Sequence, residues 1–331
     1  MVILGIDTSC DDTSFALLKD GRDLLSNLVS SQIDLHKAFG GVVPEIASRK
    51  HLELIDGLYK ESLYNADISD ESIDAIGVTV GPGLIGSVLI GLCFAKGLSL
   101  ALNIPIIGVN HIEAHAMSIL LEKDVEFPFI ALVVSGGHTI ILHFDDFGIY
   151  KVLGSTRDDA AGEAFDKIAK FLGLGYPGGR IIEEMSQTGE RNFVAFPRPM
   201  LVDSNYDFSF SGLKTSMINY IKKNGINDHN INHILSSFQE AACDVLVNKT
   251  LNAARDVEIS RVVVGGGVAS NGRLRDLFHE RSVRDGIDVF FSSPIFCTDN
   301  AAMVAKVAHH YFIKGKISPI DIAVYSRMKI H

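Results

Sequence analysis

The chain has 331 residues, of which 47% are hydrophobic and 21% are charged, which is typical of a globular protein with room for two domains. Its 40 acidic and 30 basic residues give a formal net charge of −10, so it lacks the overall positive charge of a protein that binds nucleic acid unaided. Binding of nucleic acid through a local basic patch or with the help of a basic partner protein stays an alternative. The four cysteines show no C-x-x-C spacing, which argues against a zinc knuckle or a disulfide framework and favours a reduced, cytoplasmic protein.

The N-terminus enters a strand pattern at once, without a signal-type segment, so we expect the mature protein to start at Met1. The most apolar stretch, 84–109, carries one charge but is interrupted by glycines and by Asn103-Ile-Pro105. This pattern predicts a buried helix followed by a buried strand rather than a membrane span.

Hydrophobic periodicity divides the first half into a β-β-β-α-β-α series. The expected strands cover 2–8, 13–19, 23–31, 74–80 and 105–109, and the expected helices cover 44–64, 86–102 and a segment from His111. The second half repeats the series with large helical insertions. Its expected strands cover 128–135, 138–144, 149–156, 260–265 and 287–292, and its expected helices cover 160–172, 178–188, 232–257, 271–284 and 301–314. The segment 190–231 has the aromatic and proline content of an elaboration that serves a site.

Each half begins with a strand, a turn of small and hydroxyl-bearing residues, and a second strand, at 3–18 and at 129–144. Two such turns would offer backbone N–H groups and hydroxyls to the phosphates of one nucleotide from both sides. The duplication predicts an α/β protein of the two-lobed actin, sugar kinase and Hsp70 superfold, with nucleotide in the cleft. The expected lobes are 1–127 and 128–331, and the last helix, about 301–314, is expected to pack back on the first lobe.

His111 and His115 open a helix directly after a strand, and at 3.6 residues per turn they lie only ~40° apart on one face. Both imidazoles could bind one metal ion, with Asp299 completing a two-histidine, one-carboxylate site. The alternatives are two ordinary helix histidines and an Asp299 or Thr298 that only caps a helix. Glu113 lies on the opposite side of the helix, so it could not act as the base of a zincin-type metalloprotease.

Glycine-rich turns suggest where a nucleotide would bind. The segment 262–275 runs from a strand through three glycines into a helix and includes Asn271, which could contact ribose or base. The turn in 133–137 could also be an ordinary hairpin. Asp166 and Glu183 lie on helices expected to border the cleft; the alternative is that they lie on solvated helix faces.

Two further motifs could contact ligands. Asp7, Asp11 and Asp12 are clustered on the first loop and could hold metal, water or ribose, or simply cap turns. The segment 208–215 combines phenylalanines, hydroxyls and a lysine, which could stack RNA bases and pair with phosphates. An edge strand with a core phenylalanine is the alternative.

Seven motifs in order along the chain closely resemble the TsaD-type tRNA threonylcarbamoyltransferases, once misnamed O-sialoglycoprotein endopeptidases, and the first loop resembles the bacterial branch. They are Asp7-Thr-Ser-Cys-Asp-Asp-Thr13, Gly40-Gly-Val-Val-Pro-Glu-Ile-Ala-Ser-Arg49, Gly81-Pro-Gly-Leu84, His111-Ile-Glu-Ala-His115, Val134-Ser-Gly-Gly-His-Thr139, Phe208-Ser-Phe-Ser-Gly-Leu-Lys-Thr215 and Val264-Gly-Gly-Gly-Val-Ala-Ser-Asn271.

The resemblance implies transfer of a threonylcarbamoyl group from threonylcarbamoyl-adenylate to the exocyclic amine of the adenosine 3′ to the anticodon, in tRNAs that read codons beginning with A; AMP leaves. It implies one metal ion, Fe²⁺ in the usual family description with Zn²⁺ as the alternative, held by His111, His115 and Asp299. The implied adenylate-binding residues are Val133, Val134, Ser135, Gly136, Gly137, Asp166, Gly179, Glu183 and Asn271. Relatives commonly have Asp where this chain has Glu183, and Leu where it has Val133.

The transfer needs both reactants to be oriented and the growing charge on the carbonyl and phosphate to be stabilised. Asp11 is the candidate proton acceptor. The resemblance further implies a catalytically silent paralogous subunit that forms a heterodimer, an ATPase subunit, and a separate enzyme that makes the adenylate. Three other hypotheses are a metalloprotease, a small-molecule kinase of the same superfold with a catalytic Asp in the second lobe, and a scaffold paralogue without metal ligands.

Overall fold

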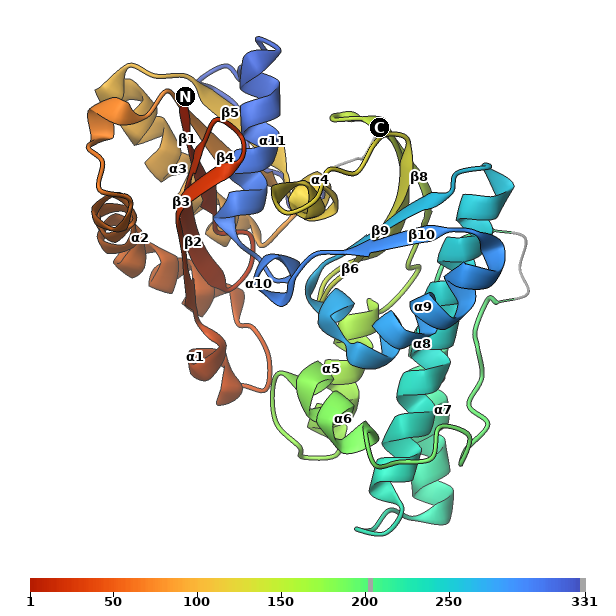
Figure 1. Cartoon of the computed structure of the whole chain (residues 1–331). Helices are drawn as coiled ribbons and strands as arrows, with labels where there is room; N and C mark the ends of the chain where they lie inside the picture. Colours follow the sequence, from red (N-terminus) through yellow and green to blue (C-terminus); the bar gives the residue numbers. More distant parts are fainter. Residues whose placement is uncertain (202–204, 328–331) are drawn as a thin grey trace. The chain divides into compact units, whose positions relative to one another are not determined.

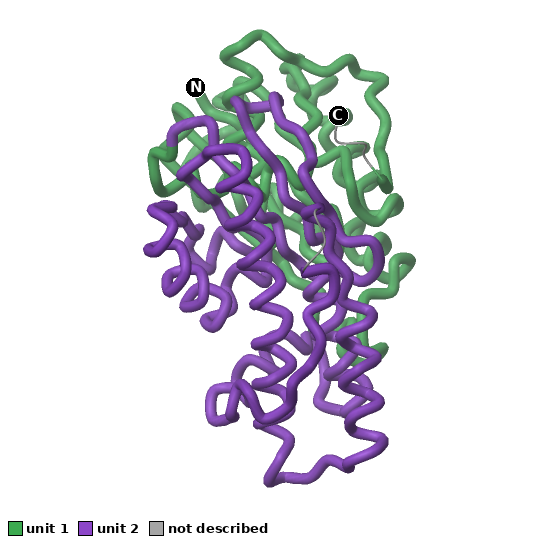
Figure 2. Tube along the Cα trace, turned by 90° about the vertical axis from the view of Figure 1, so that its right-hand side faces the viewer, with its two compact units in different colours: residues 1–125, 298–330 green, residues 126–297, 331 purple. Residues whose placement is uncertain are grey.

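The computed structural model describes residues 1–201 and 205–327. The chain forms two compact units (Figure 2): unit 1 contains Met1–Val125 together with the segment from Thr298, and unit 2 contains Glu126–Cys297. The predicted boundaries of 1–127 and 128–331 differ from this division, because the structure assigns the segment from Thr298, with the last helix, to unit 1.

The sheet of unit 1 has the strand order β3-β2-β1-β4-β5 (Figure 1). Its strands are β1 (Val2–Asp7), β2 (Asp12–Lys19), β3 (Asp23–Ser31), β4 (Ala75–Gly81) and β5 (Ile106–Asn110). Its helices are α1 (Ile33–Lys37), α2 (Pro44–Ala66), α3 (Ile85–Leu102), α4 (His111–Met117) and α11 (Ala301–Ile313), with 3₁₀ turns at Asp70–Ser72 and Ser118–Leu121. The first three strands are antiparallel, and β1, β4 and β5 are parallel.

The sheet of unit 2 repeats this order as β8-β7-β6-β9-β10, with the same antiparallel and parallel pairings. Its strands are β6 (Phe129–Val134), β7 (Thr139–Asp146), β8 (Ile149–Ser155), β9 (Arg261–Gly265) and β10 (Asp288–Phe291). Its helices are α5 (Ala161–Phe171), α6 (Gly178–Ser186), α7 (Ser211–Asn224), α8 (Ile231–Asp256), α9 (Gly272–Asp285) and the short α10 (Pro294–Cys297), with a 3₁₀ turn at Gly267–Ser270. The predicted duplication of the β-β-β-α-β-α unit is therefore confirmed.

Helices cover both faces of the unit 1 sheet. Leu4 and Ile6 of β1 belong to a hydrophobic core that includes residues of α2 and α3. Because side chains alternate across a strand, Gly5 between them faces the other side, where α11 packs. A Cβ on Gly5 would lie 2.2 Å from the carbonyl oxygen of Ala301, and one on Gly77 of β4 would lie 2.4 Å from the Cβ of Ala308. Two neighbouring glycines therefore bring α11 close to the sheet and so place Asp299, two residues before it.

Helix α3 has the length and apolar composition of a membrane span, with 33% of that segment buried. Its buried residues include Leu92 and Ala95, which belong to the core formed with the sheet. The sequence predicted a buried helix, but packing in unit 1 covers only the inner side of this helix.

The prediction that Phe208 and Phe210 stack RNA bases is wrong. Both side chains are fully buried in the hydrophobic core of unit 2, directly before α7. Phe208 forms an isolated bridge with Thr156 beside the edge strand β8, so the alternative of a core phenylalanine at the sheet edge is the better description. Lys214 pairs with the carboxylate of Asp159 at Nζ to Oδ2 2.5 Å.

Candidate active site

The histidine pair is positioned by the cap of α4. Asn110 ends β5, and its side-chain oxygen accepts hydrogen bonds from the backbone N–H groups of Ile112 at 2.8 Å and Glu113 at 3.2 Å. An asparagine cap starts the helix abruptly, so His111 is its first residue and His115 follows one turn later. Glu113 accepts a hydrogen bond from the Tyr311 hydroxyl of α11.

The structure brings His111, His115 and Asp299 together. The Oδ1 atom of Asp299 lies 3.0 Å from Nε2 of His115 and 3.7 Å from Nε2 of His111. One ligand atom from each residue falls within 4.8 Å of the others, and both histidines are buried. Helix α11 is capped by Asn300, whose Oδ1 accepts from the backbone N–H of Met303 at 3.1 Å. The alternative that Asp299 or Thr298 caps this helix is therefore wrong.

A second carboxylate lies behind His111. Asp7 ends β1 and is 1% exposed; its Oδ2 lies 3.3 Å from Nδ1 of His111, in ion-pair contact. Its other oxygen accepts from the backbone N–H of Ser9 at 3.0 Å. Burial alone lowers the pKa of His111, but the carboxylates of Asp7 and Asp299 outweigh burial and raise that pKa to about 9.

The three histidine and carboxylate side chains fit a divalent cation. Two imidazole Nε2 atoms and one carboxylate oxygen converge, and Nδ1 of His111 faces Asp7, as the outer nitrogen of a metal-bound histidine commonly faces a carboxylate. Imidazole with carboxylate suits Fe²⁺ and Zn²⁺. Metal binding at these residues stays a prediction.

The first loop carries acidic groups with altered proton affinity. Burial raises the pKa of Asp11 from its usual range, and Asp299 adds to this effect. Burial, followed by repulsion from Asp299, raises the pKa of Asp12 to about 7. With a pKa of about 7, the Asp12 carboxyl group can exchange a proton under physiological conditions.

Sequence reasoning missed His51, a residue of α2 that holds this loop. His51 is fully buried; its Nδ1 lies 2.7 Å from the Thr13 hydroxyl oxygen, and its Nε2 lies 3.0 Å from the carbonyl oxygen of Cys10. Burial lowers the pKa of His51, which favours the neutral ring. The sequence did contain one signal for a buried His51: it lies four residues from both Ala47 and Ile55, so it belongs to the same buried face of α2.

In unit 2 the predicted binding residues Val133 and Val134 end β6 with fully buried side chains, and the turn that follows exposes its backbone. The N–H of Ser135 donates to the carbonyl oxygen of His138 at 2.8 Å, and the His138 N–H donates to the Ser135 hydroxyl at 3.1 Å. At the exposed tip, a Cβ on Gly136 or Gly137 would meet nothing within 4 Å. The tip therefore lets a ligand approach the backbone closely.

The predicted residues on α5, α6 and α9 are linked to one another. Asp166 Oδ1 accepts from the backbone N–H of Gly178 at 2.7 Å, which fixes the start of α6 next to α5. Glu183 Oε1 accepts from the backbone N–H of Gly272 at 2.6 Å, which joins α6 to the first turn of α9. The space beside Gly179 is open, since a Cβ there would meet nothing within 4 Å.

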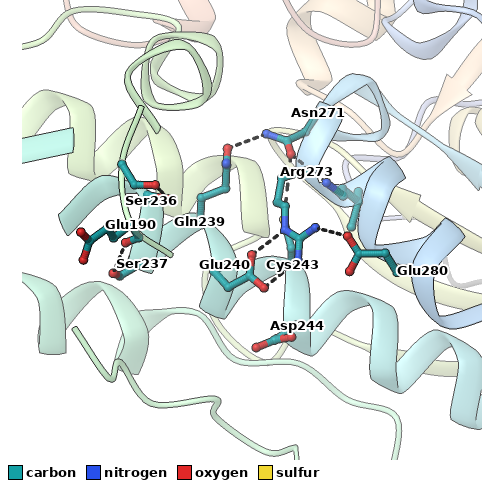
Figure 3. A network of polar contacts seen from close by, with 12 residues as sticks. Glu190, Ser236, Ser237, Gln239, Glu240, Cys243, Asp244, Asn271, Arg273 and Glu280 are labelled. Atoms are coloured by element: carbon teal, nitrogen blue, oxygen red, sulfur yellow. Dashed lines mark hydrogen bonds and ion pairs between the residues drawn. The ribbon is translucent and has the colours of Figure 1, made fainter. Parts of the chain in front are cut away.

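Asn271 is the cap of α9 and belongs to a polar network with α8 (Figure 3). Its Oδ1 accepts from the backbone N–H of Leu274 at 3.0 Å, and its Nδ2 donates to Oε1 of Gln239 at 2.9 Å. Gln239 was missed by the sequence analysis, because nothing in the α8 pattern shows which residue of α9 it faces.

Comparison with known proteins identifies the class. A family model described as "TsaD: tRNA N6-adenosine threonylcarbamoyltransferase" matches residues 23–306. Among similar solved structures, nucleotide-bound HypF gives a TM-score of 0.65 at 15% identity, covering 96% of this chain and 56% of HypF. The Clostridium difficile activator of 2-hydroxyisocaproyl-CoA dehydratase gives 0.57 at 14% identity, covering 96% and 97%. These likenesses, with the duplicated sheets, show the actin-like fold, as predicted.

Curated relatives identify the family. A protein named "tRNA N6-adenosine threonylcarbamoyltransferase" from Syntrophus aciditrophicus is 51% identical over 330 residues, covering 99% of this chain and 97% of the relative. Its namesake from Clostridium novyi is 47% identical over 332 residues, with the same coverages. The chain belongs to the TsaD family, which confirms the resemblance found in its motifs.

Proposed function

We propose that this chain is a tRNA N6-adenosine threonylcarbamoyltransferase. It transfers the threonylcarbamoyl group from threonylcarbamoyl-adenylate to the exocyclic amine of the adenosine 3′ to the anticodon, in tRNAs that read codons beginning with A. The observation that carries the proposal is the combination of about 50% identity over nearly the full length with the convergence of His111, His115 and Asp299.

Unit 2 would bind the adenylate through its backbone and its helix ends. The exposed tip at Gly136 and Gly137 offers N–H groups to a phosphate, and Gly179 leaves room for a ligand at the start of α6. Asp166 and Glu183 fix the segments around this surface. Asn271 would contact the ribose or the base. Backbone N–H groups suit a phosphate because they carry partial positive charge and need no side-chain movement.

In unit 1, His111, His115 and Asp299 would hold one divalent cation, Fe²⁺ or Zn²⁺. When bound, it would supply Lewis acidity and an anchor for the adenylate. Asp7 holds His111 from behind, so that its Nε2 faces the Asp299 carboxylate. Neutral His51 fixes the loop that carries Asp11.

The reaction forms a bond between the exocyclic nitrogen of adenosine and the carbamoyl carbon, and it breaks the bond from that carbon to the phosphate oxygen of AMP. The nitrogen loses a proton, and Asp11 is the proposed acceptor. A carboxylate of ordinary pKa takes up protons poorly at neutral pH, so the burial that raises the pKa of Asp11 improves it as a base.

A metalloprotease is the weaker hypothesis. Glu113 follows His111 by two positions and is buried with its carboxylate bonded to the Tyr311 hydroxyl. A zincin base directly follows the first histidine and faces the water bound to the metal, so Glu113 does not meet this requirement.

The proposed protein partners are a paralogous, catalytically silent subunit and an ATPase subunit. Helix α3 offers a surface for the paralogue, because its outer side exposes Ile85 by 51%, Leu89 by 46% and Leu100 by 71%. Apolar side chains concentrated on one exposed helix are typical of interaction surfaces. Replacing Leu89 with Asp should abolish heterodimer formation in size-exclusion chromatography, whereas an unchanged elution volume would exclude this surface.

The test of the function uses the purified chain with its partners, synthetic threonylcarbamoyl-adenylate and unmodified tRNA. Nucleoside mass spectrometry should detect threonylcarbamoyladenosine with the wild-type chain and lose it with His115→Ala. The absence of adduct with the wild-type chain, or full activity of the variant, would reject the assignment.

A further inference from the structure

The side-chain amide of Asn271 is held at both ends. Its oxygen caps α9 by accepting from the N–H of Leu274, and its nitrogen donates to Oε1 of Gln239 in α8. Asn271 and Gln239 are each 6% exposed, so water competes little for these bonds. Figure 3 shows the two amides end to end, with the Asn271 nitrogen directed at the Gln239 oxygen.

These two bonds permit only one orientation of the amide. If the oxygen and nitrogen of Asn271 exchanged places, the NH₂ group would face the N–H of Leu274, and the oxygen would face Oε1 of Gln239. Two donors would then oppose each other, as would two acceptors. The cap alone disfavours the exchanged state, and Gln239 adds a second, independent constraint at the nitrogen.

The distance between Gln239 and Asn271 is itself fixed by an ion pair. Glu240, the next residue of α8, binds the Arg273 guanidinium through two contacts, Nε to Oε2 at 2.6 Å and Nη2 to Oε1 at 2.9 Å. Glu280 of α9 binds the remaining Nη1 at 2.7 Å, and the Arg273 side chain is 8% exposed. A bidentate, largely buried pair of this kind holds α8 and α9 in register.

We propose that Gln239 is a positioning residue for nucleotide recognition. By accepting one N–H of the Asn271 amide, it fixes the Nδ2 group and leaves the second N–H as an oriented donor to an acceptor atom on the adenosine part of the adenylate. This inference rests on the proposed function, and it assigns Gln239 a role that is exerted through Asn271 alone.

The test measures binding of AMP to the full chain by isothermal titration calorimetry. Gln239→Leu removes the acceptor and should weaken AMP binding about tenfold, the effect of one lost hydrogen bond. Gln239→Glu keeps an acceptor oxygen and should restore most of the affinity. Cys243→Ala is the matched control: Cys243 lies one turn further along α8, is buried in the unit 2 core, and reaches the Asn271 oxygen only through its sulfur, at 3.9 Å, not the amide nitrogen. The control should bind AMP as the wild type does.

A double-mutant cycle separates positioning from direct contact or general loss of structure. Asn271→Ser keeps a capping oxygen but removes the amide nitrogen. In that background, Gln239→Leu should weaken AMP binding no further, because its target is gone. Additive losses, or an unchanged affinity of the single Gln239→Leu variant, overturn the inference.

If Gln239→Leu does not fold, as judged by its thermal unfolding midpoint, Gln239→Met replaces it in the same cycle. Wild-type protein that binds no AMP would overturn both the inference and the proposed nucleotide site, whereas AMP binding without tRNA modification would reject only the proposed reaction.

Discussion

The candidate metal ligands of unit 1 and the candidate nucleotide surface of unit 2 are built from different parts of the chain. The first consists of polar side chains: buried His111 and His115 and half-buried Asp299, with buried Asp7 next to His111. The second consists mainly of exposed backbone at glycines and of residues that hold helix ends in place. Asp7 ends β1, and the glycine tip follows β6, the equivalent strand of the duplicated fold. The same architecture thus offers two binding chemistries, which different substitutions should disrupt.

Removing a side-chain ligand should have the largest effect. His115→Ala deletes one of two buried imidazoles, and we expect metal affinity to fall by at least about a hundredfold, because even the partners of metal ligands typically contribute 10–100-fold. Competition with a chromophoric chelator measures the affinity. His143→Ala, in β7 of unit 2, should bind metal normally. Equal affinities of the two variants would exclude His115 as a ligand.

Metal affinity should also fall with pH. The metal-free protein has His111 at a pKa of about 9, so the ring is protonated at neutral pH, whereas a metal binds only the neutral ring. Metal affinity should therefore fall about tenfold for each unit of pH below about 9, which is about a hundredfold between pH 8 and pH 6. Chelator competition across this range checks the slope, and a flat profile would contradict the contribution of His111.

Asp7→Asn is the control for this pH profile. Asp7 is the larger of the two carboxylate influences that raise the pKa of His111, so its loss should flatten the profile between pH 8 and pH 6. At pH 9 the variant should still bind metal about 10–100-fold more weakly, because Nδ1 loses its carboxylate partner.

The backbone surface of unit 2 should respond to added methyl groups instead. Gly136→Ala adds a Cβ that meets nothing in the protein, so we expect an unchanged unfolding midpoint and about tenfold weaker AMP binding, through one blocked backbone contact. Gly162→Ala is the contrasting variant: its Cβ would lie 2.6 Å from the Ser135 carbonyl oxygen, so stability itself should fall by about 1–3 kcal/mol. Calorimetry of unfolding and binding checks both; unchanged AMP affinity of Gly136→Ala would remove the tip from the binding surface.

The proximity of His111 and His115 could be predicted because residue type and short spacing carry the information. Two histidines four apart after a strand lie on one helix face, and the order of parallel strands brings the ends of β1, β4 and β5 to one edge. That same order could have predicted Asp7 beside His111, since Asp7 ends β1 and His111 follows β5.

What the sequence did not predict depends on packing between distant segments. Helix α7 was missed because Phe208 and Phe210, which precede it, look like a binding motif until the core that buries them is known. His51 depends on partners in the first loop and β2, and Gln239 depends on the distance between α8 and α9. Long-range contacts of this kind leave no periodic pattern in the sequence.

The smallest effect should come from Glu183→Gln. The substitution keeps an oxygen that can accept from the Gly272 N–H, where the wild-type distance is 2.6 Å, and it removes a negative charge from the N-terminus of α9. A negative charge at that position stabilises a helix by about 0.3–1 kcal/mol, so the free energy of unfolding should fall by about that amount, whereas AMP affinity should change little because α9 stays anchored.

Glu183→Asp should weaken AMP binding more than Glu183→Gln does, although it retains the negative charge. Its shorter side chain withdraws the acceptor from Gly272, which leaves the first turn of α9 and the adjacent Asn271 less firmly held. Titration of AMP into both variants ranks them. If Glu183→Asp binds AMP as well as the wild type does, the carboxylate acts on the ligand through its charge rather than by holding α9 in place. The binding surface of unit 2 would then depend on a charged side chain, as the candidate site of unit 1 does, and not mainly on its glycines.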